Sequence, residues 1–328
     1  MTLARRFVSA VRLSIVTLAV CQLYAQPPRP PRADQVRLRS RQAAEPQTAA
    51  AGAKDTGTYI TISIPGASFL SVEGINPKGD IVGGYYDSGG IWQHFLLSNG
   101  KYTLINPPGA TPCCWAGGWL STEIGINPQG DVVASYSNAT NAGAALGFLF
   151  SRGQYTSINP PGAGCFGTIP AGINASGDIV GWYFDDSSCG FHGFLLSKGT
   201  YTNIDVPAAL GAVPGSTAAT AINDRGDITG SYNDSIGNTH GFLRSHGSFS
   251  TFDVPGAVAT YPLGISVQGD IVGWACCGST GGFLLSRGTV SAIDFPEAGS
   301  PNTVAYGINP QGDIVGTDYS NGFLLKRN

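Results

Sequence analysis

An aromatic ring and an oxygen-bearing side chain recur two positions apart at four points along the sequence. These pairs are Tyr85 with Asp87, Tyr136 with Asn138, Tyr183 with Asp185, and Tyr232 with Asp234. In an extended strand, residues two apart point to the same side. A ring beside a carboxylate or amide suits a sugar, whose C–H face stacks on the ring while its hydroxyls take hydrogen bonds. The alternative is structural, with Tyr packed between sheets and Asp or Asn holding the turn.

Tryptophan and histidine side chains extend this set of candidates. Trp182 and Trp274 lie in or beside the same segments, and His94, His192 and His240 each come shortly before a recurring Phe. A repeated histidine is more often a structural hydrogen bonder than a base. No catalytic residue is assigned, because the chain has no HExxH, G-x-S-x-G or phosphate-loop motif. The predicted ligand-binding residues are Tyr85, Asp87, Tyr136, Asn138, Trp182, Tyr183, Asp185, Tyr232, Asp234, Trp274, His192 and His240.

Six cysteines lie in long connections between these segments. They are Cys113, Cys114, Cys165, Cys189, Cys276 and Cys277. An even number in an exported protein favours disulfides, and the 15 possible pairings cannot be separated by sequence. A bridge from Cys113 or Cys114 to Cys165 and a vicinal bridge between Cys276 and Cys277 are two possibilities. Zinc is disfavoured, because vicinal cysteines lack ligand spacing, so we predict no metal and no cofactor.

The segments that position these residues belong to one unit, repeated throughout 58–328. One part of it is Gly-Ile-Asn-Pro-Lys-Gly-Asp-Ile-Val-Gly at 74–83. Its Asp recurs every 43 to 51 residues, as Asp80, Asp131, Asp178, Asp227, Asp270 and Asp313. A Phe-rich part recurs at Phe95, Phe148, Phe194, Phe242, Phe283 and Phe323. Self-similarity at this period indicates a repeat architecture.

The sequence pattern predicts four short strands in each unit. They end at Ile-Asn, Asp-Ile-Val, Phe-Leu-Leu and Tyr-Thr-x-Ile. In the Asn-Pro-x-Gly-Asp turn, Asn accepts the turn hydrogen bond, Pro presets φ and Gly takes a positive φ. The Ser-x-Gly segments predict two-residue hairpins. Because each Asp in the Asn-Pro-x-Gly turn supplies only one carboxylate, we expect it to hold the turn and not to bind calcium.

The two ends of the repeat region complement each other. The last unit stops after its Phe-Leu-Leu strand at 323–325, while 59–64 reads as a fourth strand without a unit. Pairing of the two completes an all-β, six-bladed β-propeller of four-stranded blades with no open sheet edge at the ends. An open solenoid would instead need polar capping repeats, and none is visible.

Strand direction alternates within a unit, so the connections fall on two sides. The short Asn-Pro-x-Gly and Ser-x-Gly turns share one side. The long segments between strands two and three, and between units, share the other, which we call the long-loop side. Variable loops on a rigid scaffold commonly carry binding residues, so we place the predicted ligand site there.

The first 57 residues are predicted to be an export signal and a spacer. Residues 1–25 combine Arg5, Arg6 and Arg12 with an apolar run at 13–20, which is typical of a secretory signal. A lipid anchor at Cys21 is the alternative. Residues 26–57 are rich in Pro, Arg and Ala without hydrophobic periodicity, which predicts a disordered linker. No transmembrane segment is expected in the mature chain, which should be extracellular or periplasmic and monomeric.

Composition supports the all-β prediction and argues against some partners. The chain has 47 Gly and 21 Pro in 328 residues, and both are poor in helix interiors. Residues 1–57 hold nine basic and three acidic groups, which leaves nine basic and 18 acidic groups in 58–328. An acidic body repels phosphate backbones, so nucleic acid is not an expected partner.

The repeated line at 74–83, followed in two units by His-Gly-Phe-Leu at 192–195 and 240–243, resembles the bacterial HAF extracellular repeat family. The resemblance covers nearly all of 58–328. Gly stands where the family name has Ala, and the His is missing before Phe148, Phe283 and Phe323. The resemblance implies an extracellular repeat protein and no particular reaction.

Three functions are compatible with the sequence. The first is a secreted, non-catalytic module that recognises a glycan or a cell-surface protein through the long-loop side. The second is an extracellular polysaccharide hydrolase or lyase that uses carboxylates such as Asp87, Asp185, Asp186 or Asp234 at a central pocket. The third is a purely structural envelope or matrix protein.

Overall fold

The computed structural model describes most of the repeat region. The described residues are 57–110, 123–137, 144–276, 281–296, 303–318 and 321–327. Contacts divide the chain into Met1–Ala51 and Gly52–Asn328, and all described residues lie in the second unit. The predicted export signal, Cys21 and the linker up to residue 56 lie outside them.

The described residues form strands almost throughout, which confirms the all-β prediction. They contain 24 strands and one 3-10 helix, η1 (Ala208–Leu210). No helix in these ranges has the length and apolar character needed to cross a membrane.

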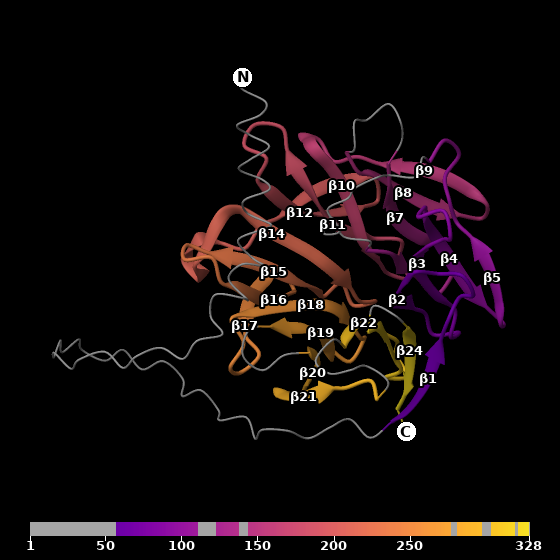
Figure 1. Ribbon diagram of the computed structural model, residues 1–328. Coiled ribbons are helices and arrows are strands. Elements are labelled where there is room, and N and C mark those ends of the chain that lie inside the picture. The colour runs from indigo at the N-terminus through magenta and orange to yellow at the C-terminus, as the bar shows by residue number, and fades with distance from the viewer. Residues whose placement is uncertain are drawn as a thin grey trace. The chain divides into compact units, whose positions relative to one another are not determined.

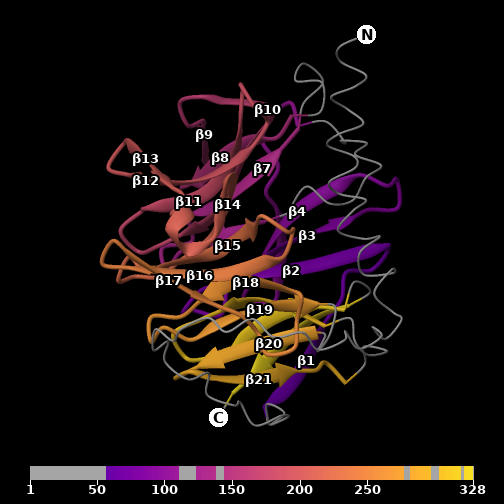
Figure 2. The same cartoon turned by 90° about the vertical axis from the view of Figure 1, so that its left-hand side faces the viewer.

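The strands form four-membered antiparallel groups that follow the sequence repeat (Figures 1 and 2). Group 1 is β2 (Phe69–Ile75), β3 (Ile81–Tyr86), β4 (Trp92–Ser98) and β5 (Lys101–Leu104). Group 2 is β6 (Gly125–Ile126), β7 (Val132–Tyr136), β8 (Leu146–Ser151) and β9 (Gln154–Ile158). Group 3 is β10 (Ala163–Ile173), β11 (Ile179–Asp185), β12 (Phe191–Ser197) and β13 (Thr200–Ile204).

The remaining groups repeat the pattern. Group 4 is β14 (Ala212–Ile222), β15 (Ile228–Asp234), β16 (Thr239–Ser245) and β17 (Ser248–Phe252). Group 5 is β18 (Ala259–Ile265), β19 (Ile271–Cys276), β20 (Gly281–Ser286) and β21 (Thr289–Ile293). Group 6 is β22 (Val304–Ile308), β23 (Ile314–Thr317), β24 (Gly322–Lys326) and, from the other end of the repeat region, β1 (Thr58–Ile62).

The pairing of β1 with β24 confirms the predicted match between the two ends. The strands are antiparallel and in register from Thr58 opposite Lys326 to Ile62 opposite Gly322. Figure 1 shows the indigo strand β1 directly beside the yellow strand β24. The ring of Tyr59 lies 5.6 Å from the rings of both Phe295 and Phe323, so β1 contributes to the core as well as to the sheet.

The groups contact one another through their first strands. β2 contacts β6, β6 contacts β10, and the series continues through β14 and β18 to β22, which contacts β2. Short parallel pairings between β12 and β14 and between β16 and β18 also join groups 3 to 5 into one 12-stranded sheet.

The core lies between neighbouring groups and repeats with the sequence. The recurring Phe of the third strand is at most 2% exposed in every group, at Phe95, Phe148, Phe194, Phe242, Phe283 and Phe323. Around Phe242, for example, Val180 of group 3 packs against Ile228 of group 4. Burying one such ring contributes a few kcal/mol, and the repetition spreads this stabilisation around all the groups.

The Asn of the Asn-x-x-Gly-Asp turn connects neighbouring groups in four of these turns. Asn76 Oδ1 accepts hydrogen bonds from the N–H groups of Lys78 and Asp80, as the turn prediction requires. Its Nδ2 donates to Asp80 Oδ2 and to the carbonyl of Asn127 in the next group. The same link between groups runs from Asn127 to Asn174, from Asn174 to Asn223 and from Asn223 to Ser266.

Both kinds of short turn lie on the same side, as predicted. Ser98, at the Ser-x-Gly hairpin, donates from Oγ to Oδ1 of Asp80 at 2.5 Å, and Ser245 does the same to Asp227 at 2.6 Å. These hydrogen bonds give the turn carboxylates their predicted structural role. In the hairpin itself, Asn99 has φ 50° and Gly100 has φ 74°, which is the conformation of a type I′ turn.

A threonine in the first strand, or directly before it, anchors the connection from the preceding group. Its Oγ1 accepts a backbone N–H in three groups, at Thr217 from Val206, Thr260 from Val254 and Thr303 from Phe295. Thr168 stands in the same place in group 3, but the aligned donor position is Pro160, which has no N–H. The buried Thr168 Oγ1 therefore has no hydrogen-bond partner.

Candidate functional site

The predicted Tyr and Asp pairs lie at the end of the second strand on the long-loop side. In groups 3 and 4 both members face the same histidine, which confirms that they share a side of the strand. Tyr183 stacks near His192, with 5.8 Å between ring centroids, and Asp185 Oδ2 lies 3.7 Å from His192 Nε2. Tyr136 packs on Phe148, while its partner Asn138 lies outside the described residues.

The Asp carboxylates accept hydrogen bonds from backbone N–H groups in the connections between the second and third strands. Asp87 Oδ1 accepts the N–H groups of Gly89 and Ile91. Asp234 Oδ1 accepts those of Ile236 and Asn238. This arrangement is the structural alternative considered above, in which the Asp organises its own turn.

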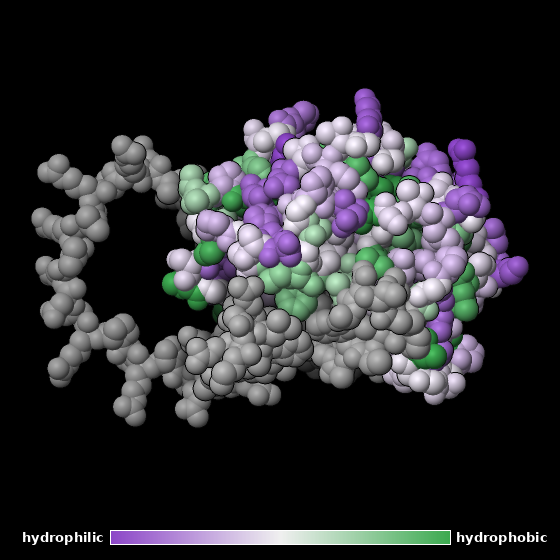
Figure 3. Space-filling view, turned by 90° about the horizontal axis from the view of Figure 1, so that it is seen from above, coloured by the Kyte–Doolittle hydropathy of each residue, from purple (hydrophilic) through white to green (hydrophobic). Residues whose placement is uncertain are grey.

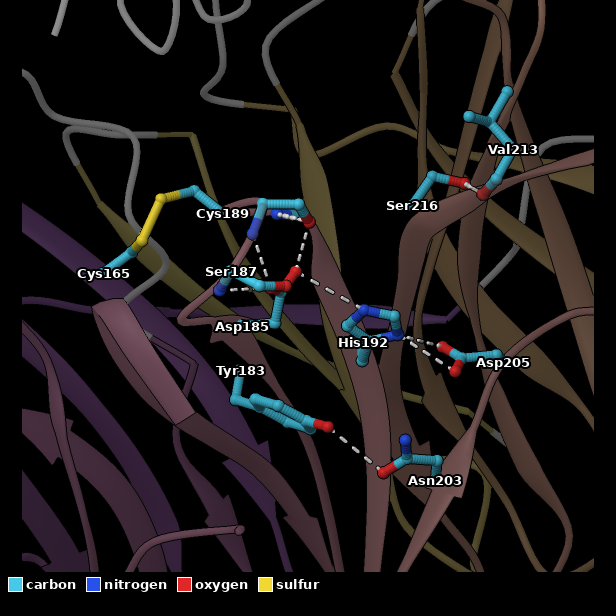
Figure 4. A network of polar contacts seen from close by, with 12 residues as sticks. Cys165, Tyr183, Asp185, Ser187, Cys189, His192, Asn203, Asp205, Val213 and Ser216 are labelled. Carbon is cyan, nitrogen blue, oxygen red and sulfur yellow. Dashed lines mark hydrogen bonds and ion pairs between the residues drawn. A yellow bond between two sulfur atoms is a disulfide. The ribbon is translucent and has the colours of Figure 1, made fainter. Parts of the chain in front are cut away.

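Asp185 is held most strongly (Figure 4). Its Oδ1 accepts the N–H groups of Ser187 and Ser188, each at 2.7 Å, and the hydroxyl of Ser187 at 2.6 Å. Its Oδ2 accepts the hydroxyl of Ser188. The hydroxyl donors, followed by the backbone ones, hold the pKa of Asp185 far below its usual range. This carboxyl group is therefore ionised at neutral pH and cannot serve as a proton donor.

His192 bridges two segments of the chain, as Figure 4 shows. Its Nε2 faces Asp185, and its Nδ1 lies 3.0 Å from Oδ2 of Asp205, which begins the connection from β13 to β14. Tyr183 lies beneath, and its hydroxyl is hydrogen-bonded to Asn203 Oδ1 at 3.2 Å. We call the triad Asp185–His192–Asp205 the first Asp–His–Asp network.

Group 4 repeats this arrangement as the second Asp–His–Asp network, Asp234–His240–Asp253. His240 Nδ1 lies 2.9 Å from Asp253 Oδ1, and its Nε2 lies 3.2 Å from Asp234 Oδ2. Burial favours the neutral imidazole, but the hydrogen bonds and negative charges of the two carboxylates outweigh it and raise the pKa of His240. Hydrogen bonding to His240 and to the backbone outweighs burial at Asp234 and lowers its pKa.

Group 1 carries an uncharged version in which the central residue is Gln93. Gln93 Nε2 donates to Asp87 Oδ2 at 3.0 Å, and Gln93 Oε1 accepts from Asn106 Nδ2 at 2.6 Å. The strand registers show that Gln93 and His192 occupy equivalent positions. Phe95 lies opposite Leu104 in group 1, just as Phe194 lies opposite Asn203 in group 3. Gln93 therefore aligns with His192 and His240.

The grouping of His94 with the other two histidines is wrong. His94 is one residue closer to its Phe, so it points to the opposite side of the strand. It is 4% exposed, and its Nε2 accepts a hydrogen bond from Trp92 Nε1. Burial lowers the pKa of His94 to about 4, so it is a neutral core residue at physiological pH.

The stacking role predicted for the tyrosines needs correction in groups 3 and 4. Tyr183 is 5% exposed and Tyr232 is 4% exposed. Tyr232 stacks on His240 and donates from its hydroxyl to the carbonyl of Leu210. Their ring faces are covered by protein and have no room for a sugar. Tyr85 is half-buried and packs near Phe95.

Other aromatic residues gather at the β3–β4 and β11–β12 connections, and they were not predicted as a set. In group 1 these are Phe69, Tyr86 and Trp92, with ring centroids 5.0 to 6.1 Å apart. We call them the first aromatic cluster. All three are half-buried, which leaves part of each ring open to solvent. The sequence contains a sign of this cluster, because an aromatic residue stands on each side of the β3–β4 connection, Tyr86 before it and Trp92 after it.

The second aromatic cluster, in group 3, consists of Phe166, Phe184 and Phe191. Phe184 lies 5.0 Å from Phe166 and 6.3 Å from Phe191 between ring centroids. These three rings are half-buried, while the neighbouring Trp182 is 9% exposed. Trp182 packs against Phe184 and so contacts the second aromatic cluster. The fifth-group Trp274 stacks on Tyr261 at 5.5 Å, and it is half-buried.

The disulfide in the described residues joins Cys165 and Cys189, which are separated by 24 residues within group 3. The bridge considered from Cys165 to Cys113 or Cys114 is therefore wrong, because the sulfur of Cys165 is already bonded. Cys113, Cys114 and Cys277 lie outside the described residues, and Cys276 is buried at the end of β19. The bridge, drawn in yellow in Figure 4, ties the β11–β12 connection to β10.

A small cavity of about 90 Å³ lies where the first strands of all six groups meet. Two carboxylates, Glu73 and Glu123, line it, and the sequence reasoning missed both. Glu73 accepts the N–H of Ile124, and Glu123 accepts the indole N–H of Trp182 at 3.1 Å. Desolvation, with a further contribution from the negative charge of Glu73, raises the pKa of Glu123 to about 8 against the opposing indole hydrogen bond.

Metal ligands are not assembled in the part of the chain that the structure describes, since no group of three or more His, Cys, Asp or Glu side chains there could hold an ion. The described surface in Figure 3 mixes hydrophilic and hydrophobic residues. Two features gather on the long-loop side of the described residues, the two aromatic clusters and the Asp side chains that hold the connections.

No protein-family model matches the chain, and no curated protein matches it. Among solved structures, a protein of unknown function from Dyadobacter fermentans has a TM-score of 0.50 at 11% identity, over 82% of this chain and 98% of its own. A six-bladed β-propeller lectin from Aleuria aurantia, described with a fucose recognition mode, has a TM-score of 0.45 at 14% identity, over 78% and 89%. TolB from Acinetobacter baumannii has a TM-score of 0.47 at 14% identity, over 79% of this chain and 54% of its own, so the chain spans about half of TolB.

Proposed function

We propose that the chain is a secreted, non-catalytic binding module, built as a closed six-bladed β-propeller of the HAF repeat type, that recognises a glycan through its long-loop side. The β1–β24 pairing and the circular series of contacts between first strands support the closed propeller. The Cys165–Cys189 disulfide supports export, because disulfides persist in oxidising compartments. A cell-surface protein is the alternative partner.

The two half-exposed aromatic clusters carry this proposal. Each contains partly open rings and has a carboxylate one residue further along the strand, Asp87 after Tyr86 in group 1 and Asp185 after Phe184 in group 3, on the other side of the sheet. Aromatic faces take the apolar side of a sugar, and carboxylates or amides take its hydroxyls. The disulfide and the capped turn hold the group 3 residues in place, which reduces the entropy lost on binding.

The same carboxylates are unsuited to acid catalysis. Hydrogen bonding at Asp87, led by the N–H of Ile91, outweighs burial and lowers its pKa, and the serines of the β11–β12 connection do the same at Asp185. A general acid for glycoside cleavage needs a raised pKa. These groups therefore fit a role in binding and in holding loops.

Replacing Phe184 and Phe191 together with alanine should weaken glycan binding about tenfold or more, because each aromatic contact contributes about 1 kcal/mol or more. The measurement is a glycan microarray followed by calorimetric titration of the best ligand. The matched control is Tyr102→Ala, which removes a 39% exposed ring on β5 and should leave affinity unchanged. Failure of every glycan to bind wild-type protein, or equal effects of both variants, would reject the proposed site.

A hydrolase or lyase is the second candidate, and Glu123 favours it. Its raised pKa keeps it protonated at neutral pH, and Glu73 lines the same cavity and supplies a second carboxyl group. If the chain cleaves polysaccharide, Glu123→Gln should lower the rate at least about a hundredfold, as loss of an acid catalyst does, and should leave binding intact. A reducing-sugar assay on a polysaccharide panel tests this, and an inactive wild type removes the candidate.

A further inference from the structure

Each Asp–His–Asp network joins two segments that are otherwise connected only through the strands. Asp185 and Asp234 are the last residues of the second strands, directly before the connections to the third strands. Asp205 and Asp253 begin the connection to the next group. The imidazole between them therefore links two long-loop segments.

Whether the imidazole can donate a hydrogen bond to both carboxylates depends on its protonation. An imidazolium donates from both nitrogens, whereas a neutral imidazole donates from one and turns a lone pair towards the other partner. In the second network both nitrogens of His240 face carboxylate oxygens, at 2.9 and 3.2 Å. The other titratable side chain packed on the ring is Tyr232, whose centroid lies 5.2 Å away.

The first network has the same arrangement with a looser contact. His192 Nδ1 lies 3.0 Å from Asp205, but its Nε2 lies 3.7 Å from Asp185. Tyr183 is the titratable side chain packed on this ring, and Gly215 of β14 lies close to Nε2 on the other side. The second network therefore has the tighter contacts between its imidazole and both carboxylates.

We propose that the second Asp–His–Asp network is a pH-dependent clamp, which holds the β15–β16 connection to the following inter-group connection while the imidazole of His240 is protonated and releases it when the proton leaves. Group 1 holds the same segments together with Gln93, which cannot titrate. The chain thus contains a pH-independent copy of its own clamp. The inference concerns the loops and is independent of the identity of any ligand.

The direction of the effect follows from the pKa of His240, which the two carboxylates raise above its ordinary value despite burial. The stabilisation is complete below the unfolded-state pKa of about 6.5 and is lost as pH rises through the higher folded-state pKa. The clamp is therefore closed in mildly acidic solution and open in alkaline solution.

Amide hydrogen exchange of the full chain, followed by NMR and expressed as protection factors, tests the clamp at about pH 5.5 and about pH 8.5, on either side of the ordinary histidine pKa. The amides of Ile236 and Asn238, which donate to Asp234, should lose protection about tenfold at the higher pH, as expected for one lost charge-assisted hydrogen bond. The amides of Gly89 and Ile91, which donate to Asp87, should keep theirs.

His240→Gln reproduces the residue that group 1 uses and should abolish the pH dependence at Ile236 and Asn238. The wild-type comparison needs no variant, so it remains decisive if this variant folds poorly. Equal pH responses of the group 1 and group 4 amides in wild type would overturn the proposal. So would an unchanged response at Ile236 and Asn238 in a folded His240→Gln protein.

Discussion

Replacing Tyr59 and Ile62 together with alanine is expected to lower the free energy of unfolding by about 5 kcal/mol, as for two truncations in a packed core. Both side chains belong to β1. Tyr59 faces the core of group 6, and Ile62 faces the core of group 1. The Tyr59 ring packs against Phe295 and Phe323, and Ile62 is 6% exposed within a cluster that includes Leu70. The loss arises because β1 supplies the fourth strand that the last repeat lacks.

The matched control lies between the two residues. Ile60 is 47% exposed on the same strand, and Ile60→Ala should cost less than about 1 kcal/mol. Chemical denaturation followed by tryptophan fluorescence measures both variants. If the double variant is no less stable than the control, β1 does not contribute to the folded core and the closure of the repeat region by its two ends is wrong.

Asn174→Ala is expected to cost about 3 kcal/mol, since it leaves one buried and several partly buried hydrogen-bonding groups without their partner. The amide of Asn174, which is 3% exposed, accepts from the N–H groups of Ser176 and Asp178 and donates to Asp178 and to the carbonyl of Asn223. Its removal therefore affects its own turn and the link to the next group together. Thermal and chemical denaturation measure the loss.

Asn174→Ser provides the comparison, because group 5 naturally has Ser266 at this place. Ser266 Oγ still accepts the N–H of Asp270 at 3.1 Å. We expect serine to retain one of the turn hydrogen bonds and to cost about half as much as alanine. Equal losses for the two variants, or a loss below about 1 kcal/mol for alanine, would show that the asparagine links contribute little.

Much of the fold could be predicted because the sequence repeats its turn chemistry. The Asn-x-x-Gly-Asp and Ser-x-Gly turns each recur five times and set the strand boundaries, so errors in one copy are corrected by the others. The pairing of β1 with β24 followed from counting strands at the two ends. Such arguments use only local backbone preferences and the period of the repeat.

The side-chain arrangement could be predicted only in part. The alignment of His94 with His192 failed because a shift of one residue moves a side chain to the other face of a strand. The pairing of Cys165 depended on the path of β10, whose 11 residues bring Cys165 and Phe166 beside the β11–β12 connection. Whether the Tyr183 ring is open depended on packing between groups, which no single repeat records.

The most direct test of glycan recognition is to map the binding surface. Backbone amide shifts of the labelled protein are followed by NMR while a glycan identified on the microarray is added. We predict that the perturbed amides lie on the long-loop side, around Phe184 and Phe191 or around Trp92. Perturbations confined to the short turns, around Asn76 or Ser98, would contradict the proposed function.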